Sequence, residues 1–199
     1  MTEHRVAALY VDVDRGPYAS IDGVDLWGVD RDAAKYDGPY PVIAHPPCGP
    51  WGRLRHLCGR DLLAQEQLGP IAVDQVRRWG GVLEHPTDSK LWTACRMAPP
   101  NGLPDGFGGI TISVEQWLWG HRAVKPTWLY IVRGEIPALP DVPATPRPAS
   151  GGRKARSIDP SKRSMTERLS KNERHLTPRA FALWLVQIAR SVSASMEGQ

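Results

Sequence analysis

Cysteine is scarce in this chain, and long apolar runs are absent. The 199 residues contain three cysteines, Cys48, Cys58 and Cys95. Their odd number and irregular spacing argue against a disulfide framework. No apolar run approaches the roughly 20 residues that cross a bilayer, and the N-terminus lacks a signal-peptide pattern. We therefore predict a cytoplasmic protein, and its length favours one domain with a sizeable core.

Acidic residues are few in the late part of the chain, where basic residues gather. The formal net charge is only +4, but its distribution is uneven. This asymmetry predicts a polyanionic partner, nucleic acid first, and the alternative is a solvated charge run. The basic residues in question are Arg147, Arg153, Lys154, Arg156, Lys162, Arg163, Arg168, Lys171, Arg174 and Arg179.

Short apolar runs that end in polar residues predict an α/β fold with a mostly parallel sheet. Val42-Ile-Ala44 reaches Pro46-Pro47, where the chain must leave the sheet because proline cannot donate to a ladder. Helical spacing predicts a helix from Asp61 to Trp79, with a kink or a new start at Pro70. A last helix begins at Thr177-Pro178 and buries Phe181, Leu185, Ile188 and Ala189. Further strands are expected at Val6–Val11, Val24–Val29, Val82–Pro86, Ile110–Gln116 and Thr127–Val132.

The connections divide the chain into three parts. Only about a dozen residues, broken by Pro17 and Gly23, separate the first two strands, so a crossover helix barely fits there. Residues 1–135 are expected to form the catalytic α/β domain. Residues 136–175 are expected to be a Pro-rich linker and basic segment. Residues 176–199 are expected to be a C-terminal helix that packs back on the domain.

The Pro-Pro-Cys stretch presents one thiol at the end of a buried strand. Open α/β sheets place their chemistry at this edge, which favours Cys48 as a nucleophile, although a lone cysteine is also a common buried apolar residue. The strand that follows ends in Glu84-His85-Pro86. Both strands end alike, so we expect Cys48 and Glu84 to lie at the same edge of the sheet.

A thiol beside a carboxyl group suits one particular reaction. A thiolate adds to carbon 6 of a pyrimidine if a group near ring nitrogen 3 relieves the negative charge. The adduct makes carbon 5 nucleophilic, so that an electrophile can be captured there. The base must be flipped out of a duplex or single-stranded. For Glu84 a solvated carboxylate or a surface ion pair is the alternative.

Ala44-His-Pro-Pro-Cys48 resembles the catalytic loop of cytosine-5 DNA methyltransferases, and Glu84-His-Pro86 resembles their Glu-Asn-Val motif. Gln116 to Gly120 and Lys125 to Tyr130 are similar to segments of compact, phage-type relatives. The resemblance implies a Rossmann-like, mostly parallel sheet of the methyltransferase type with a minimal cofactor half. It also implies Cys48 as nucleophile, Glu84 as the acid, and S-adenosylmethionine held by Asp12, Asp30 and Pro46. The family's Phe-x-Gly-x-Gly loop is missing, because Tyr10 to Gly16 contains a single glycine.

Basic and aromatic residues near these motifs are candidates for contacts with the substrate or DNA. They are Arg53, Arg55, His85, Arg122 and Lys125. Trp51, Trp117 and Trp119 could stack on an extruded base, or could pack in the core. For His45, a hydrogen-bonded loop residue is weighed against a proton shuttle. A zinc site built from His45, Cys48, His56, Cys58 and His85 is a further alternative, but its spacing matches no ordinary motif.

The sequence therefore predicts modification of a pyrimidine, cytosine in DNA first, at carbon 5, through a Cys48 adduct and by methyl transfer. Two alternatives stay open. One is the same adduct chemistry on a nucleotide or base with another donor. The other is a non-catalytic DNA-binding relative. No metal is expected in this interpretation.

Overall fold

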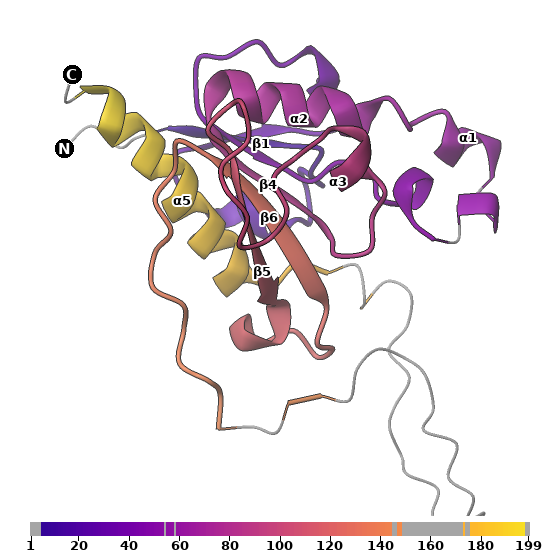
Figure 1. The fold of residues 1–199 in the computed structure, drawn as a ribbon. Helices are drawn as coiled ribbons and strands as arrows, with labels where there is room; N and C mark the ends of the chain where they lie inside the picture. Colours follow the sequence, from indigo (N-terminus) through magenta and orange to yellow (C-terminus); the bar gives the residue numbers. More distant parts are fainter. Residues whose placement is uncertain are drawn as a thin grey trace, which may run out of the picture.

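A computed structural model of the chain describes residues 5–53, 55–57, 59–144, 147–148, 173 and 176–197. Within them, one mixed sheet lies between two long helices (Figure 1). The strands are β1 (Val6–Leu9), β2 (Val24–Trp27), β3 (Val42–Ala44), β4 (Gly81–Pro86), β5 (Ile110–Glu115) and β6 (Pro126–Val132). The α-helices are α1 (Arg60–Leu63), α2 (Leu68–Trp79), α3 (Leu91–Ala94) and α5 (Arg179–Glu197). Five 3₁₀ turns are η1 (Pro17–Ser20), η2 (Ala33–Lys35), η3 (Gly49–Trp51), η4 (Arg55–Leu57) and η5 (Gln116–Trp119).

The strand order is β2-β1-β3-β4-β6-β5. β2, β1, β3 and β4 are parallel, while β6 runs antiparallel to both of its neighbours, β4 and β5. From β1 the chain goes outward to β2 and then returns to β3 on the other side of β1. In open α/β sheets such a reversal opens a crevice at the carboxyl ends of the strands, where ligands bind. The predicted α/β fold with a mostly parallel sheet is confirmed.

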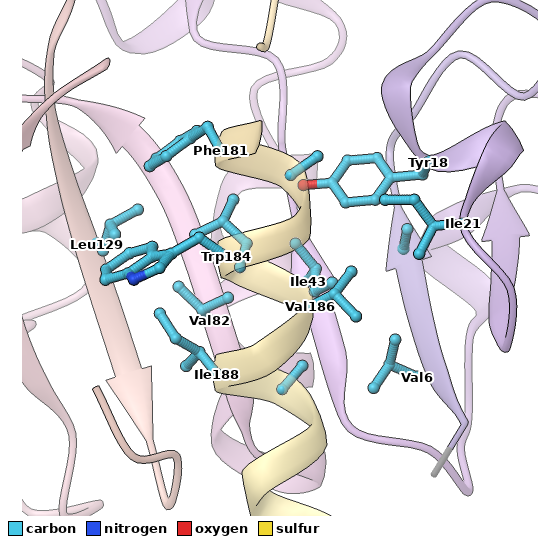
Figure 2. Close-up of a cluster of buried hydrophobic side chains, with 14 of the residues drawn as sticks. Val6, Tyr18, Ile21, Ile43, Val82, Leu129, Phe181, Trp184, Val186 and Ile188 are labelled. Atoms are coloured by element: carbon cyan, nitrogen blue, oxygen red, sulfur yellow. The ribbon is translucent and has the colours of Figure 1, made fainter. Parts of the chain in front are cut away.

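Side chains alternate between the two faces of the sheet, and each face is covered by one helix. Val6, Ala8, Ile43 and Val82 pack with Phe181, Leu185 and Ile188 of α5 (Figure 2). On the opposite face, Ala7, Leu9, Val42, Ala44 and Leu83 pack with Ala72, Val73 and Val76 of α2. Strands buried on both faces explain why the sequence shows continuous apolar runs instead of alternation.

Most of the predicted elements are present, with shifted ends. β1 and β2 are two residues shorter than expected, and the predicted Asp61 to Trp79 helix is split into α1 and α2. Gly80 ends α2 at φ 76°, a conformation that glycine adopts without strain. The turn η1 stands where a crossover helix would connect β1 to β2. α5 begins at Arg179 and buries the four residues named in advance.

The segment after β6 lies along α5 (Figure 1). The Trp184 indole N–H donates to the carbonyl of Ala138 at 3.1 Å, and the Glu135 N–H donates to Ser191 Oγ at 2.8 Å. Arg147 then forms an ion pair with Glu115 at the end of β5. Most of the basic stretch that suggested a polyanionic partner lies outside the described residues.

Candidate active site

The carboxyl ends of β3 and β4 bring Cys48 and Glu84 together, as the sequence predicted. The two strands pair in parallel, with Ala44 opposite Leu83, so the next residues of both emerge at one edge. The charge of Glu84 acts directly on the Cys48 thiol. Cys48 sits at the start of η3, where Gly49 packs so closely on Leu62 that a β-carbon would lie 2.4 Å from its side chain. This packing fixes the turn that carries the thiol.

Two side chains from distant parts of the chain hold the Glu84 carboxylate. His45 Nδ1 lies 3.0 Å from Glu84 Oε2, and Gln116 Nε2 lies 3.0 Å from Glu84 Oε1. The side chains of His45 and Glu84 are both 13% exposed, and Gln116 is fully buried. Glu84 therefore has one partner on each oxygen and little contact with solvent.

A second layer of hydrogen bonds fixes these partners in turn. The Tyr18 hydroxyl lies 2.7 Å from His45 Nε2. Gln116 Nε2 also donates to Thr127 Oγ1 at 3.0 Å, and the Thr127 hydroxyl donates to the carbonyl of Lys125 at 3.1 Å. The network thus runs through η1, the loop after β3, β4, η5 and β6. The contacts of Glu84 and His45 join residues 27 or more positions apart and therefore require the tertiary fold.

The environment keeps Glu84 ionised. Burial alone would raise its pKa, but the hydrogen bond and charge of His45, together with Lys125 and His85, outweigh burial and lower the pKa to about 2. At neutral pH the carboxylate is therefore a charged hydrogen-bond acceptor. It does not carry the proton of an acid catalyst before a ligand binds.

The Cys48 thiol keeps its proton in the resting protein. Burial raises its pKa first, and the Glu84 charge raises it further, while the nearby Lys125 ammonium opposes both effects. Lys125 is itself partly buried. Burial lowers its pKa, while the charges of Glu84 and Cys48 act in the opposite direction and raise it. One thiol, one carboxylate and one ammonium therefore share this edge of the sheet.

A pocket of about 620 Å³ opens at the reversal of the strand order, next to the Cys48 turn. Its volume is in the range of pockets for small molecules and cofactors. The walls come from the ends of β1 and β2, from η2, from Pro47, from Gln65, and from Leu68 at the start of α2. The lining residues are Tyr10, Val11, Asp12, Val13, Gly28, Val29, Asp30, Asp32, Ala33, Pro47, Gln65 and Leu68.

This pocket includes two of the three residues predicted to hold a cofactor. Asp30 is exposed and lines it. Asp12 also lines it, but its carboxylate accepts the backbone N–H groups of Asp14 and Arg15 and so shapes the loop after β1. Pro46 is buried, and its neighbour Pro47 forms the wall instead. The lining carries three carboxylates and no lysine or arginine.

The predicted basic contacts divide into two groups. Lys125 and Arg53 lie near Cys48, whereas Arg55 and Arg122 form ion pairs with glutamates. Lys125 lies at the Cys48 and Glu84 edge, and its ammonium donates to the carbonyl of Leu176 at 2.9 Å. Arg53 is exposed on the turn that follows Cys48. Arg55 and Arg122 form ion pairs with Glu66 and Glu173, at 3.2 and 2.5 Å.

The expected contact of His85 with a substrate needs correction. His85 is fully buried against Trp92, and burial lowers its pKa to about 4, so it is neutral and does not present a surface to a substrate. Strand alternation explains this, because neighbouring residues of β4 point to opposite faces of the sheet. Trp51, Trp117 and Trp119 are buried, which supports core packing over base stacking, the two roles weighed for them.

The zinc alternative finds no support in the part of the chain that the structure describes. There, no three histidine, cysteine, aspartate or glutamate side chains are arranged to hold a metal ion. One of the proposed ligands, Cys58, lies outside the described residues. His45 is instead hydrogen bonded on both ring nitrogens.

No sequence pattern pointed to the hydrogen bonds that Tyr18 and Gln116 make in the site. Tyr18 stands in a polar turn, and Gln116 stands at the end of a predicted strand and at the start of the segment that resembles phage-type relatives. The hydrogen-bonding role of His45 was weighed, but its partner was not identified. A cue was available for His85, since period-two alternation separates it from Glu84.

Comparison with known proteins assigns no family to this chain, so a functional assignment depends on the geometry of the site. No protein-family model matches the chain, and no curated protein matches it either. Among the described residues, the helices are too short or too polar to cross a membrane.

Proposed function

We propose that this protein modifies a pyrimidine at carbon 5, with cytosine in nucleic acid as the substrate and a methyl group as the transferred group. The observation that carries the proposal is the Cys48 thiol beside the ionised, doubly hydrogen-bonded Glu84 and the Lys125 ammonium. The adjacent pocket at the strand reversal supplies room for a donor. The mixed sheet with one reversed strand is compatible with a methyltransferase-type fold.

Cys48 and Glu84 divide the work of the first step. The Cys48 proton moves to ring nitrogen 3, and the sulfur forms a bond to carbon 6. The π electrons of the carbon 5–carbon 6 bond shift into the ring, which leaves an enamine that is nucleophilic at carbon 5. An ionised Glu84 stabilises the base in its N3-protonated, electron-poor form by charge and by a hydrogen bond. Lys125 favours the thiolate as it forms.

The charge of the pocket favours a cationic donor. Asp12, Asp30 and Asp32 line it, and no lining residue is a lysine or arginine. S-adenosylmethionine carries a sulfonium and an ammonium group and would supply an electrophilic methyl group when bound. Asp30, in the pocket lining, would accept ribose hydroxyls, and the valine and leucine side chains of the lining suit an adenine ring. An anionic one-carbon donor would meet three carboxylates.

Hydrogen exchange at carbon 5 tests the adduct without any donor. An enamine formed by Cys48 takes a deuteron from D₂O at carbon 5. Loss of the original carbon 5 proton to solvent, with departure of the Cys48 sulfur from carbon 6, then restores the carbon 5–carbon 6 double bond and leaves a 5-deuterated base. We expect this exchange with a cytosine-containing single-stranded oligonucleotide and its loss in Cys48→Ala, measured by mass spectrometry. Binding of S-adenosylmethionine by calorimetry tests the donor separately.

Three outcomes are decisive. Exchange with donor binding supports methyl transfer. Exchange without donor binding supports the same adduct chemistry with another donor, and it would overturn the assignment of S-adenosylmethionine. Absence of exchange, with nucleic-acid binding equal in the native protein and Cys48→Ala, would leave a non-catalytic binding protein.

A further inference from the structure

We infer that Tyr18 and His45 are positioning residues that hold Glu84 as an aimed, ionised acceptor, so that this protein fixes its reacting carboxylate with a Tyr–His pair. The inference rests on the proposed function for its consequence on catalysis. Its structural content stands on hydrogen bonds between three buried or nearly buried side chains, from η1, the loop after β3, and β4.

The direction of each hydrogen bond follows from the chemistry of the partners. An ionised carboxylate only accepts hydrogen bonds, so His45 Nδ1 must carry the hydrogen that faces Glu84. Nε2 then faces the Tyr18 hydroxyl at 2.7 Å. A phenol both donates and accepts. It therefore serves His45 as a neutral imidazole, by donating to Nε2, and as an imidazolium, by accepting from Nε2.

Because the Tyr18 hydroxyl can both donate and accept, it can hold the His45 ring in place. If His45 gains or loses a proton, its ring does not need to turn, and the Nδ1–H bond to Glu84 persists. Tyr18 cannot easily move away, because it is 2% exposed and packs beside α5 with Ile21 and Phe181 (Figure 2). Burial and the Glu84 charge hold its own pKa well above the usual range, so the phenol stays protonated.

The second carboxylate oxygen of Glu84, Oε1, is also held by a side chain that has a further hydrogen-bond partner. The Gln116 amide nitrogen must face the carboxylate, and this orientation also satisfies Thr127 Oγ1. The remaining titratable groups whose charge acts on Glu84 are His85 and Lys125, and Glu84 in turn acts on Cys48. Of all these groups, only His45 has a direct hydrogen bond to the carboxylate and a second partner that holds its ring.

A purely structural role would make a different prediction. A buried tyrosine that only stabilises the fold can be replaced by phenylalanine with a loss of stability and no change in the pH profile. A positioning role predicts that removal of the Tyr18 hydroxyl frees the His45 ring. The Glu84 pKa then rises, because burial is no longer opposed by a fixed N–H donor.

The test uses Tyr18→Phe with Tyr130→Phe as the matched control. The Tyr130 hydroxyl also makes a 2.7 Å hydrogen bond, to Asp105 Oδ2, in a fully buried side chain away from Glu84. We expect Tyr18→Phe to lower the maximal rate of carbon 5 exchange by about tenfold with little change in KM, and to move the acid limb of the pH profile upward. The control should leave the profile in place.

His45 variants provide a rescue. His45→Asn keeps an amide N–H close to the position of Nδ1, whereas His45→Ala removes the donor. We expect the acid limb to move upward most in His45→Ala and less in His45→Asn. If both variants shift the profile equally, or if Tyr18→Phe and Tyr130→Phe behave alike, the positioning role is wrong.

A spectroscopic measurement separates this inference from the proposed function. Nitrogen-15 NMR of the ring reports directly whether His45 Nδ1 carries a hydrogen. We expect Nδ1–H in the native protein across pH 5 to 9 and a mixture of tautomers in Tyr18→Phe. If the native protein shows no carbon 5 exchange, the proposed function fails, and this spectrum still decides the inference. A native His45 that is unprotonated at Nδ1 would overturn it.

Discussion

The carboxyl edge of the sheet has two regions that are built differently. At β3 and β4 the Glu84 carboxylate has a hydrogen-bond partner on each oxygen, and those partners are fixed by further side chains. At β1 and β2 the pocket is open, and its walls include Asp30 and the almost fully exposed Val29. Chemistry needs preorganised groups, whereas a pocket for a flexible ligand can complete its contacts on binding.

The local elements explain this difference. The β1 and β2 strands are four residues each, and 3₁₀ turns stand where a full doubly wound domain has crossover helices. The loop after β1 owes its shape to Asp12, which accepts two backbone N–H groups. Two backbone N–H groups of this loop are therefore occupied by a side chain of the loop itself. The half of the sheet at β1 and β2 is minimal, while the Glu84 network is supported from five elements.

Replacing Glu84 by glutamine should give the largest difference between the two regions, because it should lower carbon 5 exchange and leave donor binding in the pocket unchanged. The variant keeps the shape but loses the charge that stabilises an N3-protonated base. We expect carbon 5 exchange to fall by about 10² to 10⁴-fold. Donor binding, measured by calorimetry, should stay within about twofold, because Glu84 does not line the pocket. Equal exchange in Glu84→Gln and the native protein would remove Glu84 from the mechanism.

The same carboxylate should make stability depend on pH. The folded-state pKa of Glu84 is about 2, below the ordinary value of 4.5, because His45 and Lys125 outweigh the effect of burial. A lowered pKa contributes stability above pH 4.5, and this contribution is lost as the pH falls from 4.5 toward 2. We expect up to about 3 kcal/mol from this group. Urea unfolding at pH 6 and pH 3 should show a smaller pH dependence for Glu84→Gln than for the native protein.

Asp30→Ala should affect the pocket alone. Loss of one charged acceptor is expected to weaken the binding of S-adenosylmethionine by about tenfold. Exchange at carbon 5 needs no donor and should not change. Asp61→Ala, at an aspartate outside the pocket lining, is the matched control for the change of charge. If Asp30→Ala lowers exchange as strongly as Glu84→Gln, the two regions are not separable.

The smallest effect is expected from Arg53, the exposed basic residue after the Cys48 turn. If it contacts a phosphate, Arg53→Ala should weaken nucleic-acid binding a few-fold and reduce the slope of log affinity against log salt by about one. Lys35→Ala, at an exposed lysine of η2, is the control. An unchanged salt slope would show that Arg53 makes no phosphate contact.

The sequence by itself determined much of the framework. Short apolar runs identified β3, β4 and β6. Pro46-Pro47 marked where the chain leaves the sheet after β3, because proline cannot donate to a ladder. Apolar residues at helical spacing identified the buried face of α5. β3 and β4 end alike in the sequence, which also predicted that Cys48 and Glu84 lie close together, since neighbouring parallel strands end at one edge of the sheet.

The tertiary structure decided what surrounds these two residues. His45 lies 39 residues from Glu84 in sequence, and Gln116 lies 32 residues away, so no local pattern could pair them. Tyr18 reaches His45 only because η1 packs on α5 and β1 pairs with β3. A side-chain hydrogen bond requires two atoms to lie within about 3 Å. That proximity follows from strand register and packing, whereas the sequence specifies only which groups are available.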